Sequence, residues 1–454
     1  MKSPLDHRKH ALLIVGALAC LLTVSALLGG CNRSEKKVLR IWETENDPAA
    51  AKIVDRIARE LEATHPGLKI EHEAIPWNDL SNKLAAAMAA GDPPDVSHLE
   101  PFMVASFQSK GLLAPIDDVI EAIGPNRIYP AVKDLQLFDG HRYGIAYAIG
   151  TTFFAYRQDW AKAKGLTIPQ TWAEFLRFAK ALQEDTNGDG IIDRYGVTLP
   201  GGSPFFMDQL TAELVASNGG RLFDEKGTPT FTEQPVIEAL EFWRELAKLA
   251  PPDWTSEAYT DQFRTFASGK VAIVPVTYAR AAKQIEKDAA VGIGNPEHFA
   301  VMEQPHGPSG QRGMATIDCE PWTIFAQSKN IALAKEFLLK FYAKENYLEY
   351  CRQVPIHLTP ILQDLAESKE YREDSFIKRW QPWLQQSLKM LQEKRVNPIF
   401  LASQTDRSLP FLMELQGSRI LTDMVLAVTQ EHKTPQEAAA EAQRKAVNFI
   451  AASR

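Results

Sequence analysis

Residues 84–116 read LAAAMAAGDPPDVSHLEPFMVASFQSKGLLAPI. The alanine-rich run that ends just before Gly91 predicts a helix over residues 79–90, with the glycine as its stop signal. The segment PPDVSHLEP that follows predicts a short strand. A helix followed directly by a strand is typical of chains in which the two kinds of element alternate.

The segments before this stretch have the same organisation. Residues 38–42 (VLRIW) predict a strand, and the loop ETENDPAA follows it. Residues 50–64 place apolar side chains four positions apart, which is the period of an amphipathic helix. Residues 68–75 alternate between apolar and polar side chains and predict another strand. The sequence therefore predicts an α/β protein with largely parallel sheets.

The rest of the chain adds capped helices and a few further strands. Thr171 and Glu174 form a capping box at the start of a helix over 171–184, and Thr434 and Glu437 repeat this device before the last helix. We also expect strands over 269–276 and 320–326, and mostly helices from residue 329 onward.

The N-terminus has the pattern of an export signal. Lys2, Arg8 and Lys9 precede an apolar run over residues 11–28, and the run ends in Leu-Gly-Gly-Cys at Cys31. That ending resembles a bacterial lipobox, so we expect residues 1–30 to be removed, Cys31 to be lipidated and residues 31–37 to form a tether. An uncleaved transmembrane anchor is the alternative, since eighteen apolar residues can just span a bilayer. The expected location is the periplasm or the outer face of the cell membrane, and the sequence leaves the choice open.

Charge and cysteine content exclude several classes of protein. The formal net charge is −7, and removal of residues 1–30 takes away a further net +2, so the mature chain is acidic and nucleic acid is an unexpected partner. Beyond Cys20 and Cys31, the chain has Cys319 and Cys351 alone, which excludes a disulfide scaffold. The two are expected to be buried thiols, with a disulfide as the alternative.

The stretch at 84–116 and five other segments resemble one known family in their order along the chain. These segments are VLRIWETEN, YGIAYAIGTTFFAYRQDW, FASGKVAIVPVTY, SKNIALAKEFLLKFYAKENYLEYC with PIHLTP after it, and KTPQEAAAEAQRKAVNFI. Together they resemble the extracellular solute-binding proteins of family 1, which are the substrate-binding lipoproteins of sugar ABC transporters, with the maltodextrin-binding type as the best-known member. The chain departs from the family at Tyr156-Arg157, where Tyr-Asn is usual.

The resemblance implies the type II periplasmic-binding-protein fold, in which crossing strands join two α/β lobes with a ligand cleft between them. We expect the N-lobe over 38–148 and 279–325 and the C-lobe over 149–278 and 326–454. Function would follow from closure of the lobes around a small carbohydrate. The expected partners are permease subunits and, through the lipid anchor, the membrane; the protein is expected to be a monomer that needs no cofactor.

A sugar is best held by aromatic rings against its faces and by carboxylates that accept hydrogen bonds from its hydroxyls. Candidates of both kinds, with one cation and one histidine, lie near expected strand ends or in loops, where α/β sheets bind ligands. They are Glu45, Trp77, Glu100, Phe205, Phe206, Tyr278, Arg280, Glu320, Trp322 and His357. Glu43 and Glu45 alternate around Thr44, so one of them is expected to face the cleft, and Glu45 is preferred.

Each candidate has a structural alternative. Trp42 and either phenylalanine fit the core. Arg280 fits a surface or hinge salt bridge, and His357 fits a hydrogen-bonded loop. Glu100 would otherwise be a solvated loop carboxylate.

Residues 185–193 (DTNGDGIID) resemble the first nine positions of a twelve-residue calcium loop. Side chains of Asp185, Asn187, Asp189 and Asp193 and the carbonyl of Ile191 would be the ligands. The twelfth position is Gly196 rather than glutamate, so a distant carboxylate would have to complete the site. The loop joins a helix to an expected strand, so we expect a structural calcium ion, with a metal-free run of Asx turns as the alternative.

Two other functions remain open on the sequence alone. A phosphorylated polyol or other polar solute could bind to the same fold, with Arg280 as the available cation. An exported glycosidase could use a pair of the carboxylates. We find no His-Glu-x-x-His, Gly-x-Ser-x-Gly or phosphate-loop motif, so an enzyme is not expected.

Overall fold

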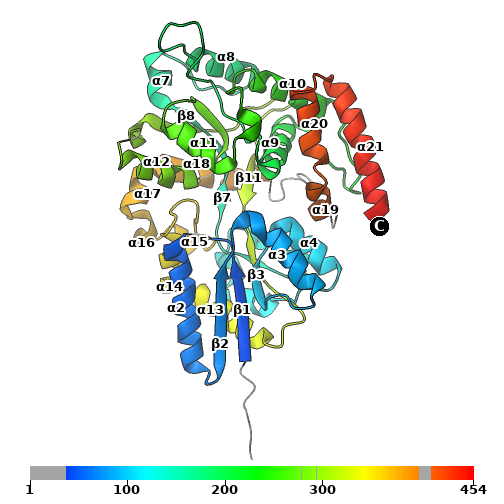
Figure 1. Ribbon diagram of the computed structural model, residues 1–454. Helices are drawn as coiled ribbons and strands as arrows, with labels where there is room; N and C mark the ends of the chain where they lie inside the picture. The colour runs from blue at the N-terminus through cyan, green and yellow to red at the C-terminus, as the bar shows by residue number, and fades with distance from the viewer. Residues whose placement is uncertain are drawn as a thin grey trace, which may run out of the picture.

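The structure is a computed structural model that describes residues 37–45, 47–277, 279–292, 294–397, 409 and 411–453. It has two lobes, one above the other in Figure 1. The export signal, Cys31 and the tether up to residue 36 lie outside the described residues. Tyr278 lies outside them as well.

The lower lobe is built on a five-stranded sheet with the order β2-β1-β3-β12-β6. Its strands are β1 (Lys37–Glu43), β2 (Leu68–Ala74), β3 (Val96–His98), β6 (Ile145–Ala146) and β12 (Pro321–Ile324). β1 runs parallel to β2 and β3, whereas β12 runs antiparallel to β3 and β6. Helices α2 (Pro48–Thr64), α13 (Ile331–Phe341) and α14 (Lys344–Cys351) lie on one side, and α3 (Trp77–Ala89) and α4 (Pro101–Ser109) lie on the other (Figure 1).

The upper lobe contains an antiparallel sheet with the order β10-β8-β9. Its strands are β8 (Phe153–Arg157), β9 (Ile273–Thr277) and β10 (Phe299–Met302). The helices of this lobe include α7 (Gln158–Ala163), α8 (Trp172–Leu182), α9 (Pro204–Ser217), α10 (Gln234–Ala247), α11 (Tyr259–Ala267), α12 (Arg280–Ala289), α17 (Ser375–Arg379), α18 (Gln381–Gln392), α19 (Leu412–Gly417), α20 (Ile420–Thr429) and α21 (Pro435–Ser453). Shorter elements complete the chain: α5 (Asp117–Ile123), α6 (Pro130–Lys133), β4 (Leu137–Phe138), β5 (His141–Arg142), α15 (Gln363–Ala366) and α16 (Lys369–Arg372).

A third small sheet, β13-β11-β7, lies where the lobes join (Figure 1). Its strands are β7 (Gly150–Thr151), β11 (Ala315–Asp318) and β13 (Val396–Asn397). Ile317 pairs with Thr151, and Ala315 pairs with Val396. The chain therefore crosses between the lobes along β7 and again along β11.

The lobe boundaries differ from those expected from the sequence. Residues 279–325 were expected in the first lobe, but β10 pairs with β8 and α12 packs against α11, which places both elements in the upper lobe. Residues from 326 were expected in the second lobe, but α13 and α14 pack against α2 in the lower one. Periodicity identifies a strand or a helix, but it does not show which sheet the element joins.

The expected parallel pairing is also limited to part of the molecule. Among the named strands, it holds for β1 with β2, β1 with β3 and β11 with β13, while the sheet of the upper lobe is antiparallel throughout.

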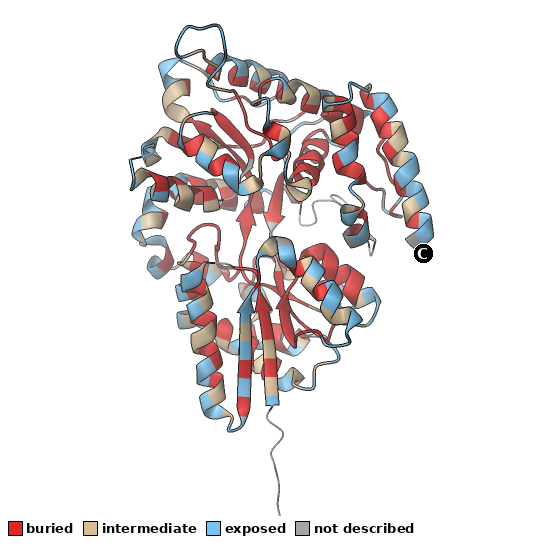
Figure 2. Cartoon of the chain, in the orientation of Figure 1, coloured by how far each residue is buried: buried red, intermediate tan, exposed pale blue. Residues whose placement is uncertain are grey.

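The two predicted capping boxes are confirmed, and α2 has a further cap that was not predicted. Asp47 caps α2 by accepting a hydrogen bond from the Ala49 N–H, and the apolar stripe of this helix is buried. Thr171 and Glu174 form the predicted capping box at α8. Thr434 and Glu437 exchange the same pair of hydrogen bonds before α21. Buried residues follow the strands and the inner faces of the helices in both lobes (Figure 2).

Cys319 and Cys351 are buried thiols, which confirms the preferred expectation. Within the described part of the chain, every helix is too short or too polar to cross a bilayer.

Candidate ligand site between the lobes

The carboxylate of Glu320 lies at the top of the lower lobe, just before β12, and several hydrogen bonds converge on it. The Thr44 hydroxyl and the Tyr147 hydroxyl each donate to Oε2 at 2.9 Å. The Trp77 indole Nε1–H donates to Oε1 at 2.8 Å. These donors come from the end of β1, the segment after β6 and the first residue of α3, so the ends of the lower-lobe elements build the site together.

Glu100 shares one of these donors. The same Trp77 Nε1–H also donates to the Glu100 carboxylate, and Glu100 is within hydrogen-bonding reach of Glu320. Burial raises the pKa of Glu320, although the hydrogen bonds from Thr44, Tyr147 and Trp77 act against this effect. Thr44, Tyr147 and Trp77 are neutral donors, so this carboxylate can exchange them for the hydroxyl groups of a ligand.

Aromatic rings from the upper lobe face Trp77. The ring centroids of Trp77 and Phe205 are 4.4 Å apart in an edge-on arrangement, and those of Trp77 and Phe206 are 5.9 Å apart. Phe206 in turn stacks on Tyr259, the first residue of α11. Phe205 and Phe206 open α9 in the upper lobe, so the two lobes meet through rings beside a pair of carboxylates.

Glu45 and Arg280 were both expected to contact the ligand, but the structure joins them to each other. Nη2 of Arg280 lies 2.7 Å from Oε2 of Glu45 in a salt bridge. Glu45 belongs to the lower lobe and Arg280 to α12 of the upper lobe. The pair therefore connects the lobes, which is the alternative expected for Arg280.

Glu43 and Glu45 have different partners because β1 ends at Glu43; within a continuous strand, residues two apart would point to the same side. Glu43 points into the lower lobe, where its carboxylate lies 2.9 Å from Nε2 of His72. Trp42 is buried, in agreement with its alternative as a core residue.

Two other predicted contacts, Trp322 and His357, are buried. The Trp322 ring is 0 % exposed and packs against Phe337 and Phe341, so it belongs to the core of the lower lobe and cannot serve as a ligand platform here. Glu320 lies two residues before Trp322 and just outside β12, so the alternation of the strand does not fix the direction of its side chain. His357 is buried, and burial and the nearby charge of Arg280 hold its pKa well below the usual range.

Three residues of the site were not predicted. Thr44 and Tyr147 donate directly to Glu320, and His98 holds both in place. Nδ1 of His98 accepts the Thr44 N–H at 3.1 Å, and its ring stacks on Tyr147 with centroids 4.1 Å apart. Burial holds the pKa of His98 well below its ordinary value, so the ring is neutral. Thr44 follows the expected strand 38–42 closely, and this position is the sequence signal that could have placed it at a strand end.

The acidic loop at 185–193 lies away from this junction, after α8. Both carboxylate oxygens of Asp185 accept backbone N–H groups, from Gly188 and Gly190 at 2.7 Å each. Asn187 and Asp189 accept the N–H two residues further on, as Asx turns do. Gly190 has a φ of +87°, which explains the glycine at this position.

The described residues include no group of three histidine, cysteine or acidic side chains arranged to hold a metal ion. The Asx-turn alternative accounts for the loop as it stands.

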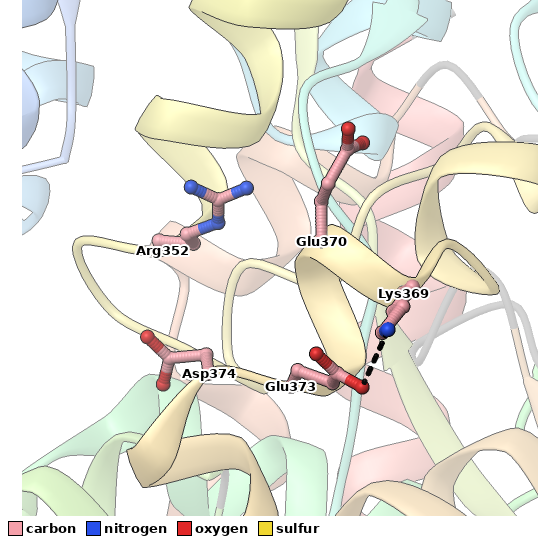
Figure 3. A pocket seen from close by; sticks show the side chains of 5 residues that line it. All are labelled: Arg352, Lys369, Glu370, Glu373 and Asp374. Atoms are coloured by element: carbon pink, nitrogen blue, oxygen red, sulfur yellow. Dashed lines mark ion pairs between the residues drawn. The ribbon is translucent and has the colours of Figure 1, made fainter.

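A shallow pocket on the outer surface has a different character (Figure 3). It is lined by Arg352, Lys369, Glu370, Glu373 and Asp374. Lys369 and Glu373 form an ion pair at 3.6 Å, and Arg352 faces Glu370 across the gap. The lining contains no aromatic ring and none of the predicted ligand residues, so the rings and carboxylates at the lobe junction remain the candidate site.

Two α/β lobes joined by crossing strands, with rings and carboxylates at their junction, define a two-lobed binding protein. The sequence profile of the bacterial extracellular solute-binding proteins matches residues 42–347. The chain belongs to this family.

Similar proteins include several named for carbohydrates. The chain is 24% identical to the diacetylchitobiose binding protein DasA of Streptomyces coelicolor, over 73% of this chain and 77% of the relative. It is 24% identical to the arabinooligosaccharide-binding protein of Halalkalibacterium halodurans, over 83% and 81% of the two chains. A sugar transporter protein from Arthrobacter chlorophenolicus, solved with bound laminaribiose, superimposes with a TM-score of 0.74 at 19% identity and covers 90% of this chain and 99% of its own. The structural match confirms the two-lobe fold.

Proposed function

We propose that this protein is the substrate-binding component of an ABC importer, that it captures a sugar or a related polyol or oligosaccharide between its lobes, and that it delivers this solute to the permease. The observation that carries the proposal is the Glu320 cluster. The carboxylate has neutral donors and lies near Glu100, and one of the donors, Trp77, faces the rings of Phe205 and Phe206. Carboxylates and rings are the two kinds of group that a sugar needs. The names of the relatives support the same class of ligand.

The same contacts disfavour the two alternatives. A phosphorylated solute needs a cation, and Arg280, the cation expected for it, is engaged by Glu45. A glycosidase needs about 5 Å or more between its two carboxyl groups so that the reacting carbon fits. Glu100 and Glu320 are within hydrogen-bonding reach of each other and share one N–H, which leaves no such space.

A thermal-shift screen of the protein without residues 1–30 tests the proposal. A sugar, sugar alcohol or oligosaccharide at about 100 times its Kd should stabilise the folded state by roughly 2.7 kcal/mol. Glycerol phosphates and amino acids are the comparison compounds. Stabilisation by a phosphorylated compound alone, or turnover of a chromogenic glycoside, would contradict it.

We also propose that the chain is exported and lipidated at Cys31, which would keep it near its permease. Labelling of expressing bacteria with a radioactive fatty acid tests this step. The wild-type protein should carry the label, and a Cys31→Ala variant should not.

For the acidic loop we propose a structural calcium ion that would replace part of the Asx-turn network. The support is the spacing of Asp185, Asn187 and Asp189, with Gly190 in the conformation that such a loop requires. This ion would secure a corner of the upper lobe and take no part in ligand binding.

A further inference from the structure

Helix α12 is fixed to the upper lobe by one of its faces. Ala281, Ala282 and Ile285 are buried. Glu286 accepts hydrogen bonds from Arg379 at 2.9 Å and from the Trp380 indole at 2.8 Å. The helix therefore moves with the upper lobe.

The first turn of the same helix reaches the lower lobe. Arg280 and Lys283 are three residues apart, so their side chains lie on one side of the helix. Arg280 pairs with Glu45 at 2.7 Å. Lys283 pairs with the Asp47 carboxylate and donates to the Gln353 carbonyl at 2.7 Å.

The receiving groups are held firmly in the lower lobe. Glu45 is 1 % exposed, and its Oε1 also accepts the Asp47 N–H at 2.9 Å. Asp47 is at the same time the N-cap of α2. Gln353 follows α14, which packs against α2. Two cations of one lobe thus meet carboxylates and a carbonyl that the other lobe has already positioned, and separation of the lobes would break every one of these contacts.

We propose that Arg280 and Lys283 form an interlobe clasp with Glu45, Asp47 and Gln353, and that this clasp holds the lobes together without contacting the ligand. Arg280 and Lys283 are then positioning residues. The inference rests on the proposed function in one respect, because it states that these residues contribute to the affinity for the ligand.

Closure and affinity are linked because the apparent Kd rises as the binding-competent state becomes less populated. Loss of both partly exposed ion pairs should weaken binding of a neutral sugar about three- to tenfold. Salt screens the pairs, so wild-type affinity for an uncharged ligand should fall with ionic strength, and this dependence should vanish in the variant.

Calorimetric titration with the best neutral sugar from the screen, at low and high salt, tests the clasp. The variants are Lys283→Gln and the double variant Arg280→Gln/Lys283→Gln. Glu286→Gln is the matched control, because it removes an ion pair of the same helix that stays within the upper lobe. Small-angle scattering of each ligand-free protein gives the opening of the lobes directly.

The clasp predicts weaker binding, lost salt dependence and a larger radius of gyration in the double variant, with Lys283→Gln intermediate and Glu286→Gln unchanged. Equal affinity and scattering of the double variant and the wild type would overturn it. A second outcome would also overturn it. If the double variant loses binding while Lys283→Gln binds normally and the scattering is unchanged, Arg280 contacts the ligand itself. If no sugar binds to the wild type, the proposed function fails, and the scattering comparison still decides on the clasp.

Discussion

Glu320 is partly buried and Glu213 is fully buried, and the two carboxylates have similar chemistry in different surroundings. Glu213 is 1 % exposed and accepts hydrogen bonds from the Thr152 hydroxyl at 2.7 Å, the Thr316 N–H at 3.3 Å and the Gln304 amide at 3.4 Å. Like Glu320, it has neutral donors and a pKa raised by burial. The donors of Glu213, however, come from the crossing segment after β7, from β11 and from the segment after β10.

The difference shows that the position of a carboxylate in the fold, rather than its chemistry, determines whether it binds ligand or stabilises the protein. Glu320 lies where the lobes meet and beside rings of the opposite lobe, so a ligand can replace its donors. Glu213 lies behind the crossing strands and fastens α9 to them. We therefore expect Glu320 to affect affinity and Glu213 to affect stability.

The largest expected effect concerns stability and Glu213. Burial raises the pKa of Glu213 to about 7, from an ordinary value of 4.5. The folded state then holds a proton that the unfolded state has released, so stability is lost as the pH rises from about 4.5 to about 7, by about 3 kcal/mol in total. Glu213→Gln should remove this loss. Urea unfolding at several pH values compares the two proteins, and an identical pH slope in both would contradict the assignment.

The next effect concerns affinity and the rings. Trp77→Leu removes a ring that faces Phe205 and a donor to Glu320, so sugar binding should weaken by roughly 1 kcal/mol or more. Trp160→Leu is the matched control, because that indole stacks on Arg157 and Arg194, away from the junction. Calorimetry measures both variants. Unchanged affinity in Trp77→Leu would remove the ring from the site.

A smaller effect is the pH dependence of affinity. The raised pKa of Glu320 means that acid protonates this carboxyl within an accessible range, and a protonated carboxyl accepts hydrogen bonds less well. Affinity for a neutral sugar should therefore fall severalfold as the pH is lowered, and the dependence should flatten in Glu320→Gln. A steeper dependence in the variant would point to another titrating group.

The smallest expected effect concerns the acidic loop. Calcium should raise the melting temperature by a few degrees over chelator through mass action on the folded state. Asp185→Asn with Asp189→Asn should abolish the difference and leave sugar affinity unchanged. Equal melting temperatures of the wild type with calcium and with chelator would contradict the calcium site, and the Asx turns alone would then stabilise the loop.

The fold could be predicted from the sequence wherever local patterns decide it. The caps at Asp47, Thr171 and Thr434 are set by neighbouring residues, and the buried stripe of α2 follows from its period. The lobe boundaries depend on which sheet β10, α12 and α13 join, and those contacts are far apart in the chain.

The same limit applies to the site. Glu100 and Glu320 follow or precede short strands, and their place at the sheet edge could be expected. Glu213 looks like an ordinary helical glutamate, because nothing in the sequence shows that α9 is buried from Met207 to Ser217. Trp322 was predicted to be a ligand platform because the sequence does not show which face of β12 it lies on. That face depends on the pairing of β12 with β3 and β6.

Calorimetric titration of the best sugar into the wild type, Glu320→Gln and Glu213→Gln at one pH tests the central claim most directly. The account predicts that Glu320→Gln loses about 1.5–3 kcal/mol of binding free energy, because a hydrogen bond to a charged acceptor is lost, while Glu213→Gln binds like the wild type. Wild-type affinity in Glu320→Gln, or an equal loss in both variants, would contradict it.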